Sequence, residues 1–90
     1  MREIRETSVF TKDLKSLPVN IQEEAWKITC ILSEDVFDNR LDIRKLEGYK
    51  KVWRVTFKRY YRLIYTFDEE SVYLLRVRHR KDIYRKGIKL

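Results

Sequence analysis

The chain has 90 residues, of which 43% are hydrophobic and 39% charged, and its net charge is +7. This length predicts one domain spanning residues 1–90, and the hydrophobic content excludes a disordered tail. No uncharged stretch is long enough to cross a bilayer and no secretory signal is visible, so we expect a cytoplasmic protein without a membrane partner. The single cysteine, Cys30, forms no internal disulfide and is expected to be a small buried hydrophobe, and no Cys/His spacing predicts a metal site.

The positive charge is concentrated in the C-terminal part of the chain. Residues 1–39 carry 5 Lys and Arg against 8 Asp and Glu, a net charge of −3, whereas residues 40–90 carry 16 against 6, a net charge of +10. A field of one sign attracts phosphate backbones and speeds encounter with them. Because the basic residues alternate with aromatic ones, this split favours a polyanion-binding surface over a merely solubilising one.

Two amphipathic helices are predicted in the N-terminal part. A short strand at residues 2–6 precedes a helix that begins with Ser8 as its N-cap and ends near Leu17. Pro18 ends this helix and precedes a second one, at residues 19–34, so the pair predicts a helical hairpin. The apolar residues recur at helical spacing, as Phe10, Leu14 and Leu17 in the first helix and Ile21, Ala25, Ile28 and Leu32 in the second.

The apolar period changes to two after an irregular segment, residues 35–51. Three strands are predicted, at about 53–58, 61–67 and 72–79, joined by consecutive hairpins into an antiparallel meander. The two helices must cover one face of this sheet, which makes the fold class α+β. Alternation places three groups toward that face: Trp53, Val55 and Phe57; Tyr61, Leu63, Tyr65 and Phe67; Tyr73, Leu75 and Val77.

The opposite face of the predicted sheet is cationic. Like charges on neighbouring strands repel one another, and a phosphate-rich ligand would relieve the cost. The residues expected on this face are Arg54, Thr56, Lys58, Arg62, Arg76, Arg78 and Arg80.

Several motifs in this order resemble the RelE/ParE superfamily of toxins from type II toxin–antitoxin systems. They are the stretch Phe10–Pro18, Lys45-Leu46-Glu47-Gly48, Trp53-Arg54-Val55, Tyr61-Arg62-Leu63-Ile64-Tyr65 and Val77–Arg85. The resemblance implies a helical hairpin packed on a curved antiparallel sheet that cradles RNA. It also implies two partners, a cognate RelB-like antitoxin in a toxin–antitoxin hetero-oligomer and the 70S ribosome with its mRNA. RelE-like members cut the mRNA in the A site by attack of a 2′-hydroxyl on the adjacent phosphodiester, with no metal or other cofactor.

The resemblance also implies site residues. Arg62 matches a phosphate-stabilising arginine, Arg54 a basic position of the site, Arg80 a transition-state contact and Tyr84 a tyrosine that stacks on the substrate. His79 is the only histidine, but strand alternation turns it away from Arg78 and Arg80. The further RNA-binding candidates are Lys45, Lys50, Lys51, Lys58, Arg78, His79 and Lys81.

The general base is left open. Thr56 stands where RelE has a lysine, and a threonine is no base at neutral pH; Lys58, Lys50 and Lys51 are possible substitutes, and Glu47 is the acid nearest to the position where other relatives have a glutamate. Two other functions compete with the nuclease: a ParE-like poison of DNA gyrase, and a non-catalytic nucleic-acid-binding module.

Overall fold

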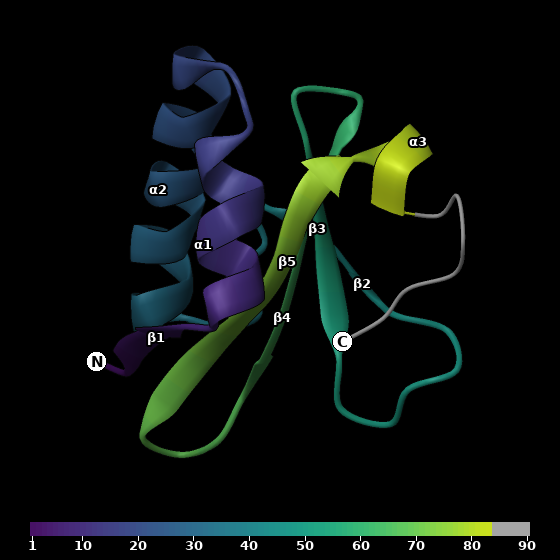
Figure 1. The fold of residues 1–90 in the computed structure, drawn as a ribbon. Helices are drawn as coiled ribbons and strands as arrows, with labels where there is room; N and C mark the ends of the chain where they lie inside the picture. The colour runs from purple at the N-terminus through teal and green to yellow at the C-terminus, as the bar shows by residue number, and fades with distance from the viewer. Residues whose placement is uncertain (84–90) are drawn as a thin grey trace.

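The computed structural model describes residues 1–83 and contains one mixed sheet with helices on either side. The sheet order is β1-β5-β4-β3-β2; β1 is parallel to β5 and the other neighbours are antiparallel. Helices α1 and α2 lie together against one face, while α3 lies beyond the end of β5 (Figure 1). The elements are β1 (Glu3–Glu6), α1 (Ser8–Lys15), α2 (Val19–Glu34), β2 (Asp42–Lys45), β3 (Trp53–Phe57), β4 (Tyr61–Phe67), β5 (Ser71–His79) and α3 (Arg80–Ile83).

The predicted helical hairpin is present, with one change at its start. The N-cap of α1 is Thr7 and not Ser8: the Thr7 hydroxyl oxygen accepts the backbone N–H of Phe10 at 3.1 Å. The same hydroxyl donates to the carbonyl of Leu74 at 2.9 Å, which ties the start of α1 to β5. Pro18 separates the helices, and its carbonyl accepts the N–H groups of Ile21 and Gln22 at the start of α2.

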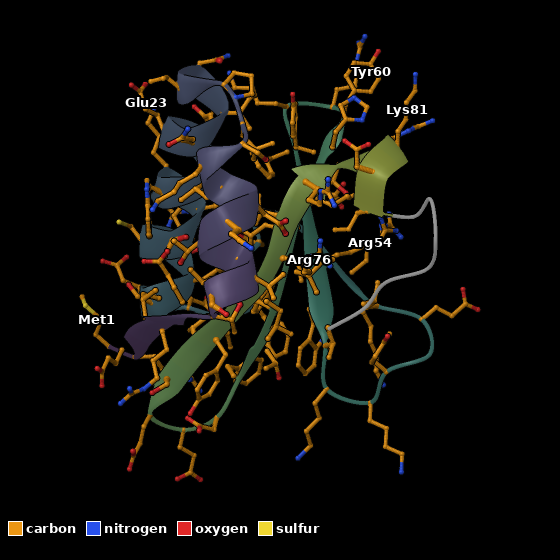
Figure 2. All side chains as sticks on the ribbon, viewed as in Figure 1. Met1, Glu23, Arg54, Tyr60, Arg76 and Lys81 are labelled. Carbon is orange, nitrogen blue, oxygen red and sulfur yellow. The ribbon has the colours of Figure 1, made fainter. Side chains whose placement is uncertain are left out.

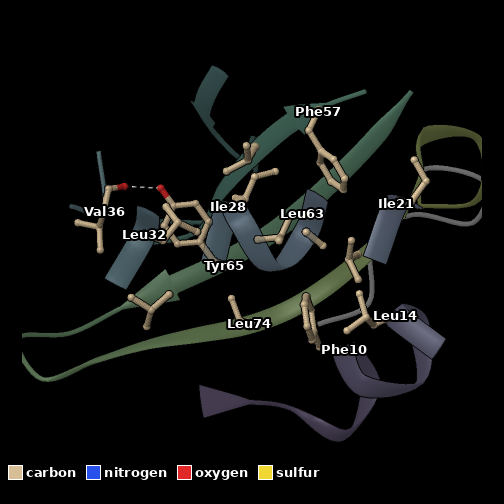
Figure 3. Close-up of a cluster of buried hydrophobic side chains, with 14 residues drawn as sticks. Phe10, Leu14, Ile21, Ile28, Leu32, Val36, Phe57, Leu63, Tyr65 and Leu74 are labelled. Carbon is tan, nitrogen blue, oxygen red and sulfur yellow. Dashed lines mark hydrogen bonds between the residues drawn. The ribbon is translucent and has the colours of Figure 1, made fainter. Parts of the chain in front are cut away.

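The core lies between the hairpin and the inner side of β3, β4 and β5 (Figure 3). Apolar side chains fill it, and one hydroxyl is buried among them: Tyr65 donates a hydrogen bond to the carbonyl of Val36 at 2.5 Å. Burial raises the pKa of Tyr65 above its ordinary value. The fully buried large side chains are Tyr65, Phe10, Leu32, Leu63, Ile64, Leu74, Val55, Val72 and Val77.

Two strands extend the predicted three-stranded meander to five. The segment expected to be irregular contains β2, which pairs antiparallel with β3 and places Ile43 against the core. At the other edge β1 pairs with residues 71–74 of β5 and leaves the remainder of that edge of β5 open. The short strand predicted at residues 2–6 is β1, whereas β2, which has the same length, was not predicted.

A β-bulge in β5 overturns the predicted alternation of this strand. Ile64 pairs with Arg76 but Tyr65 pairs with Leu74, so Leu75 is an extra residue with no partner in β4. Leu74 and Val77 therefore both face the core, and Leu75 and Tyr73 do not belong to it, contrary to the prediction.

The expectation for Cys30 is also wrong, because this thiol is exposed. The buried positions of the second half of α2 are residues 28, 29, 32 and 33, and residue 30 lies on the opposite side of the helix. No helix within residues 1–83 is long and apolar enough to cross a membrane.

Candidate functional site

The face of the sheet turned away from α1 and α2, called the open face below, is set out by strand register. In one row across the strands Asp42 pairs with Thr56, Thr56 with Arg62 and Arg62 with Arg78. In the next row Arg44 pairs with Arg54, Arg54 with Ile64 and Ile64 with Arg76. Arg54 and Arg76 lie toward α3, whereas Glu23 lies on the outer side of α2 (Figure 2).

Arg62 is the central cation of the open face. It is half-buried, and its Nη1 donates a hydrogen bond to the backbone carbonyl of Tyr61 at 3.1 Å. Its Nε is buried and has no hydrogen-bond partner among the described residues. A buried donor without a partner costs about 1–3 kcal/mol, so an anion that accepts from this group would recover that free energy.

Arg54 lies one row away and is also half-buried. Within residues 1–83 neither Arg54 nor Arg62 forms an ion pair with a carboxylate. These two guanidinium groups therefore remain available for phosphate oxygens, which they can bind in bidentate fashion.

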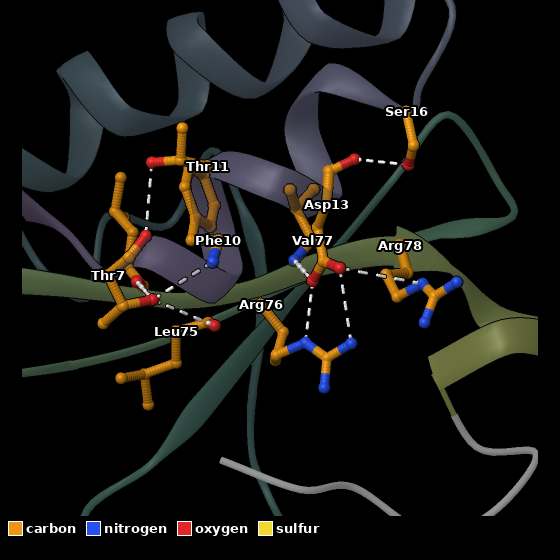
Figure 4. Close-up of polar contacts among 10 residues, drawn as sticks. Thr7, Phe10, Thr11, Asp13, Ser16, Leu75, Arg76, Val77 and Arg78 are labelled. Atoms are coloured by element: carbon orange, nitrogen blue, oxygen red, sulfur yellow. Dashed lines mark hydrogen bonds and ion pairs between the residues drawn. The ribbon is translucent and has the colours of Figure 1, made fainter.

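Arg76 and Arg78 differ from them because both contact Asp13 of α1 (Figure 4). Arg76 donates to the Asp13 carboxylate twice, from Nε at 2.7 Å and from Nη2 at 3.3 Å. The Nε of Arg78 lies 3.9 Å from Asp13 Oδ1, the oxygen that also accepts from Nη2 of Arg76. Sequence reasoning missed Asp13, although its position three residues after Phe10 and four before Leu17 places it on the apolar stripe of α1.

The sequence predicted an open face that is cationic throughout, but part of this face is apolar. Ile64 is fully buried there, in a cluster with Leu46 and Ile83, and Val52 and Leu75 pack against it. Ile83 comes from α3, so this short helix covers part of the face. The cations consequently form an arc around an apolar patch.

The start of α3 sits beside the hairpin between β3 and β4. The backbone N–H of Arg80 donates to the carbonyl of Tyr60 at 2.7 Å, and the Arg80 side chain is exposed. The His79 ring stacks on Tyr60 with centroids 5.7 Å apart, and its Nδ1 accepts the N–H of Lys81 at 3.2 Å. His79 thus lies on the side of Tyr61, its partner in β4, and is turned away from Arg62 and Arg78, as alternation indicated.

The predicted lysines do not gather in one place. Lys58 lies in the turn after β3 with a left-handed backbone (φ 47°), so it is not on the strand face where it was expected. Lys45 pairs with Trp53, a core-side residue, and therefore does not point with Arg54. Lys50 and Lys51 are exposed before β3, and the Lys51 carbonyl accepts the hydroxyl of Thr66, which places them at the end of the sheet away from Arg62. Tyr84 lies outside the described residues.

The acid–base groups of the open face include a carboxylate that sequence reasoning missed. Asp42 lies in the row of Arg62, two strands away, and forms an exposed ion pair with Arg44 at 3.6 Å. It was missed because β2 was not predicted. Residues 1–83 contain no cluster of three or more His, Cys, Asp or Glu side chains that would hold a metal ion.

The comparisons with known proteins identify the class to which this fold and face belong. Residues 4–84 match the family model described as the ParE toxin of the type II toxin–antitoxin system, parDE. The chain therefore belongs to the RelE/ParE superfamily of type II toxins, as its motifs predicted. It is 35% identical over 77 residues to Toxin RelE3 of Methanocaldococcus jannaschii, a match that covers 83% of this chain and 86% of the relative.

Solved structures of RelE-family toxins share the fold. The RelB–RelE antitoxin–toxin complex from Methanococcus jannaschii aligns with a TM-score of 0.76 at 28% identity, over 89% of this chain and 94% of that chain. The RelBE2 complex from Mycobacterium tuberculosis aligns with a TM-score of 0.73 at 26% identity, over 88% and 98%. The E. coli DinJ–YafQ complex, at 15% identity over 92% and 97%, has a TM-score of 0.78 and supports the fold alone. The predicted α+β class, with a helical hairpin on a sheet, is confirmed.

Proposed function

We propose that this toxin is an endoribonuclease that cuts mRNA in the ribosomal A site and so inhibits translation in the cytoplasm. The observation that carries the proposal is the pair Arg54 and Arg62 on the open face, which have no carboxylate partner within residues 1–83, together with the buried, unpartnered Nε of Arg62. Such a site matches a phosphodiester, which offers two oxygens to a guanidinium group.

The proposed reaction is attack of the 2′-hydroxyl on the adjacent phosphorus, with departure of the 5′-oxygen. Charge accumulates on the phosphorane oxygens, and Arg62 and Arg54 neutralise it there without having to reorganise. Asp42 is a group in the row of Arg62 that can accept the proton of the 2′-hydroxyl. Arg80, exposed at the start of α3, stabilises the leaving oxygen, and Tyr84 stacks on the substrate nucleotide. The reaction, as the family resemblance implies, uses no metal or other cofactor.

Two partners belong to the proposal. The first is a cognate RelB-like antitoxin that holds the toxin inactive in a hetero-oligomer, which is supported by relatives solved as RelB–RelE and RelBE2 complexes. The second is the 70S ribosome carrying mRNA. In this proposal Lys58, Lys81 and His79 contact RNA at the edge of the site, and Lys45, Lys50 and Lys51 contact RNA further away.

A gyrase poison is the second candidate function, because the family model that matches this chain is described as the ParE toxin of the parDE system. A poison that binds a protein has no need of arginines kept free of carboxylates. The open face therefore favours the nuclease.

Cleavage on purified ribosomes decides between these functions. We expect primer extension on a defined mRNA to show cuts that are confined to the A-site codon and that depend on ribosomes. Arg62→Ala should slow cleavage by roughly 10²–10³-fold, the usual cost of removing one transition-state donor. Lys27→Ala is the matched control, because it removes one positive charge from the exposed side of α2. Uncut mRNA combined with inhibition of DNA supercoiling would support the gyrase poison instead.

A further inference from the structure

Asp13 has contacts that helix packing alone does not require. Its side chain is only 9% exposed, and a carboxylate is seldom so buried unless it is paired. Besides the two hydrogen bonds from Arg76, one carboxylate oxygen accepts the backbone N–H of Val77 at 3.3 Å. That N–H points out of the sheet edge because β1 pairs only with residues 71–74 of β5. The carboxylate thus sits beside the part of the β5 edge that β1 leaves open.

The bulge at Leu75 determines which arginines Asp13 reaches. After the bulge, Arg76 and Arg78 follow the open face, next to Ile64 and Arg62 in β4. The pairing with Asp13 leaves little of Arg76 accessible, because its side chain is 16% exposed, whereas the side chain of Arg78 is 38% exposed. The terminal nitrogens of Arg78 point away from Asp13 (Figure 4).

Charge repulsion explains why Arg78 needs an anchor. Arg62 and Arg78 are direct cross-strand partners, and like charges so placed repel each other. A flexible Arg78 would move away from Arg62 toward solvent. The Asp13 carboxylate, 3.9 Å from Nε of Arg78, holds the base of the guanidinium group while its outer nitrogens stay available.

We infer that Asp13 is a positioning residue of the toxin, which holds Arg78 beside Arg62 so that both guanidinium groups meet the phosphates of the bound RNA strand. The inference rests on the proposed nuclease function, adds Asp13 to its site and gives Arg78, already an RNA-binding candidate, a definite place in it. Asp13 touches no substrate and acts through Arg78.

A double-mutant cycle with Asp13→Asn and Arg78→Ala tests this inference on ribosome-bound mRNA. Asparagine keeps the shape of the side chain and can still accept from Val77, but it carries no charge. We expect Arg78→Ala to lower kcat by about 10²-fold, the cost of removing a donor outright, and Asp13→Asn to lower it by about tenfold, each with a nearly unchanged KM for programmed ribosomes. The double variant should be no slower than the slower single variant, because Asp13 has no effect without Arg78. Effects that multiply would overturn the inference.

A second readout does not depend on cleavage. In the ¹⁵N-labelled toxin the Nε–H signal of Arg76, which is hydrogen-bonded to Asp13, should be protected from exchange. Asp13→Asn should abolish that protection and should shift the Nε–H signal of Arg78, whose Nε lies 3.9 Å from the carboxylate. Glu24→Gln, which removes an acidic charge from α2, should leave them unchanged. An Arg78 signal that does not respond to Asp13→Asn overturns the inference, even if the wild-type chain cuts no mRNA. If the wild-type chain cuts no mRNA but its Arg78 signal responds to Asp13→Asn, only the proposed nuclease function is overturned. If Asp13→Asn fails to fold, the wild-type Arg78 signal decides alone: a ¹⁵Nε relaxation rate typical of a freely rotating side chain overturns the inference.

Discussion

Besides Arg44, which pairs with Asp42, four arginines lie on the open face, and their guanidinium groups have different partners. Arg76 donates to the Asp13 carboxylate from two nitrogens, and Arg78 approaches it with one. Arg54 and Arg62 pair with no carboxylate within residues 1–83. This gradation runs from the edge of the sheet next to α1 toward its centre. The arginines without a carboxylate partner among the described residues are therefore those of the central strands, β3 and β4.

Asp68 shows a residue whose charge supports the fold rather than the site. One carboxylate oxygen accepts the N–H groups of Ser71 at 2.8 Å and Glu70 at 2.9 Å, and the other accepts the hydroxyl of Tyr73 at 2.9 Å. These bonds, that from Ser71 first, hold the pKa of Asp68 below its usual value. The charged form is thus preferred in the turn between β4 and β5.

The lowered pKa of Asp68 predicts a pH dependence of stability. Its contribution is present above the unfolded pKa of about 3.9 and is lost as the pH falls through the lower folded value. We expect the urea midpoint of the wild type to fall between about pH 5 and pH 3 by more than that of Asp68→Asn, which cannot titrate. Parallel midpoint curves for the two proteins would contradict this account.

At the scale of elements, β5 joins the core to the open face because its bulge changes which residues point inward. Leu74 before the bulge and Val77 after it are both fully buried in the core, three positions apart. An unbulged strand could not bury both, and it would turn either Arg76 or Leu74 to the wrong side.

The bulge makes a prediction that opposes simple alternation. Leu74→Ala should destabilise the fold by roughly 2–5 kcal/mol, because it leaves a cavity in the main core. Leu75→Ala should cost clearly less, since Leu75 is only partly buried at the edge of the small cluster around Ile64. Chemical unfolding of both variants measures the difference, and a larger loss for Leu75→Ala would mean that the strand runs without the bulge.

The sequence predicted the elements whose pattern is local and long. The stripes of α1 and α2 and the alternation of β3 and β4 each repeat over several residues, so Arg54 and Arg62 were correctly placed on one face. The bulge at Leu75 was missed because it is a property of pairing with β4 rather than of the sequence of β5. Asp42 was missed along with the short strand that carries it, and Asp13 because its partners lie more than sixty residues away.

At the scale of the whole molecule, the charge asymmetry of the chain becomes an asymmetry between layers. The acidic segment, residues 1–39, forms β1 and the helical layer, and the basic segment forms the other strands and α3. Asp13 links the two layers through its ion pairs with Arg76 and Arg78 of β5. The open face can attract RNA, while the segment 1–39 on the other side, with its net negative charge, does not compete for it.

This separation predicts how salt affects RNA binding. The affinity for a single-stranded RNA oligonucleotide should fall linearly on a log–log plot against salt, with a slope of about −0.7 per phosphate contacted. Arg54→Gln should reduce the magnitude of that slope by about one contact, because Arg54 has no carboxylate partner among the described residues and is free to meet a phosphate. Lys27→Gln removes the same charge from α2 and should leave the slope unchanged. Equal slopes for wild type and Arg54→Gln would show that RNA binds elsewhere, and an equal reduction by both variants would show that net charge, not the open face, governs binding.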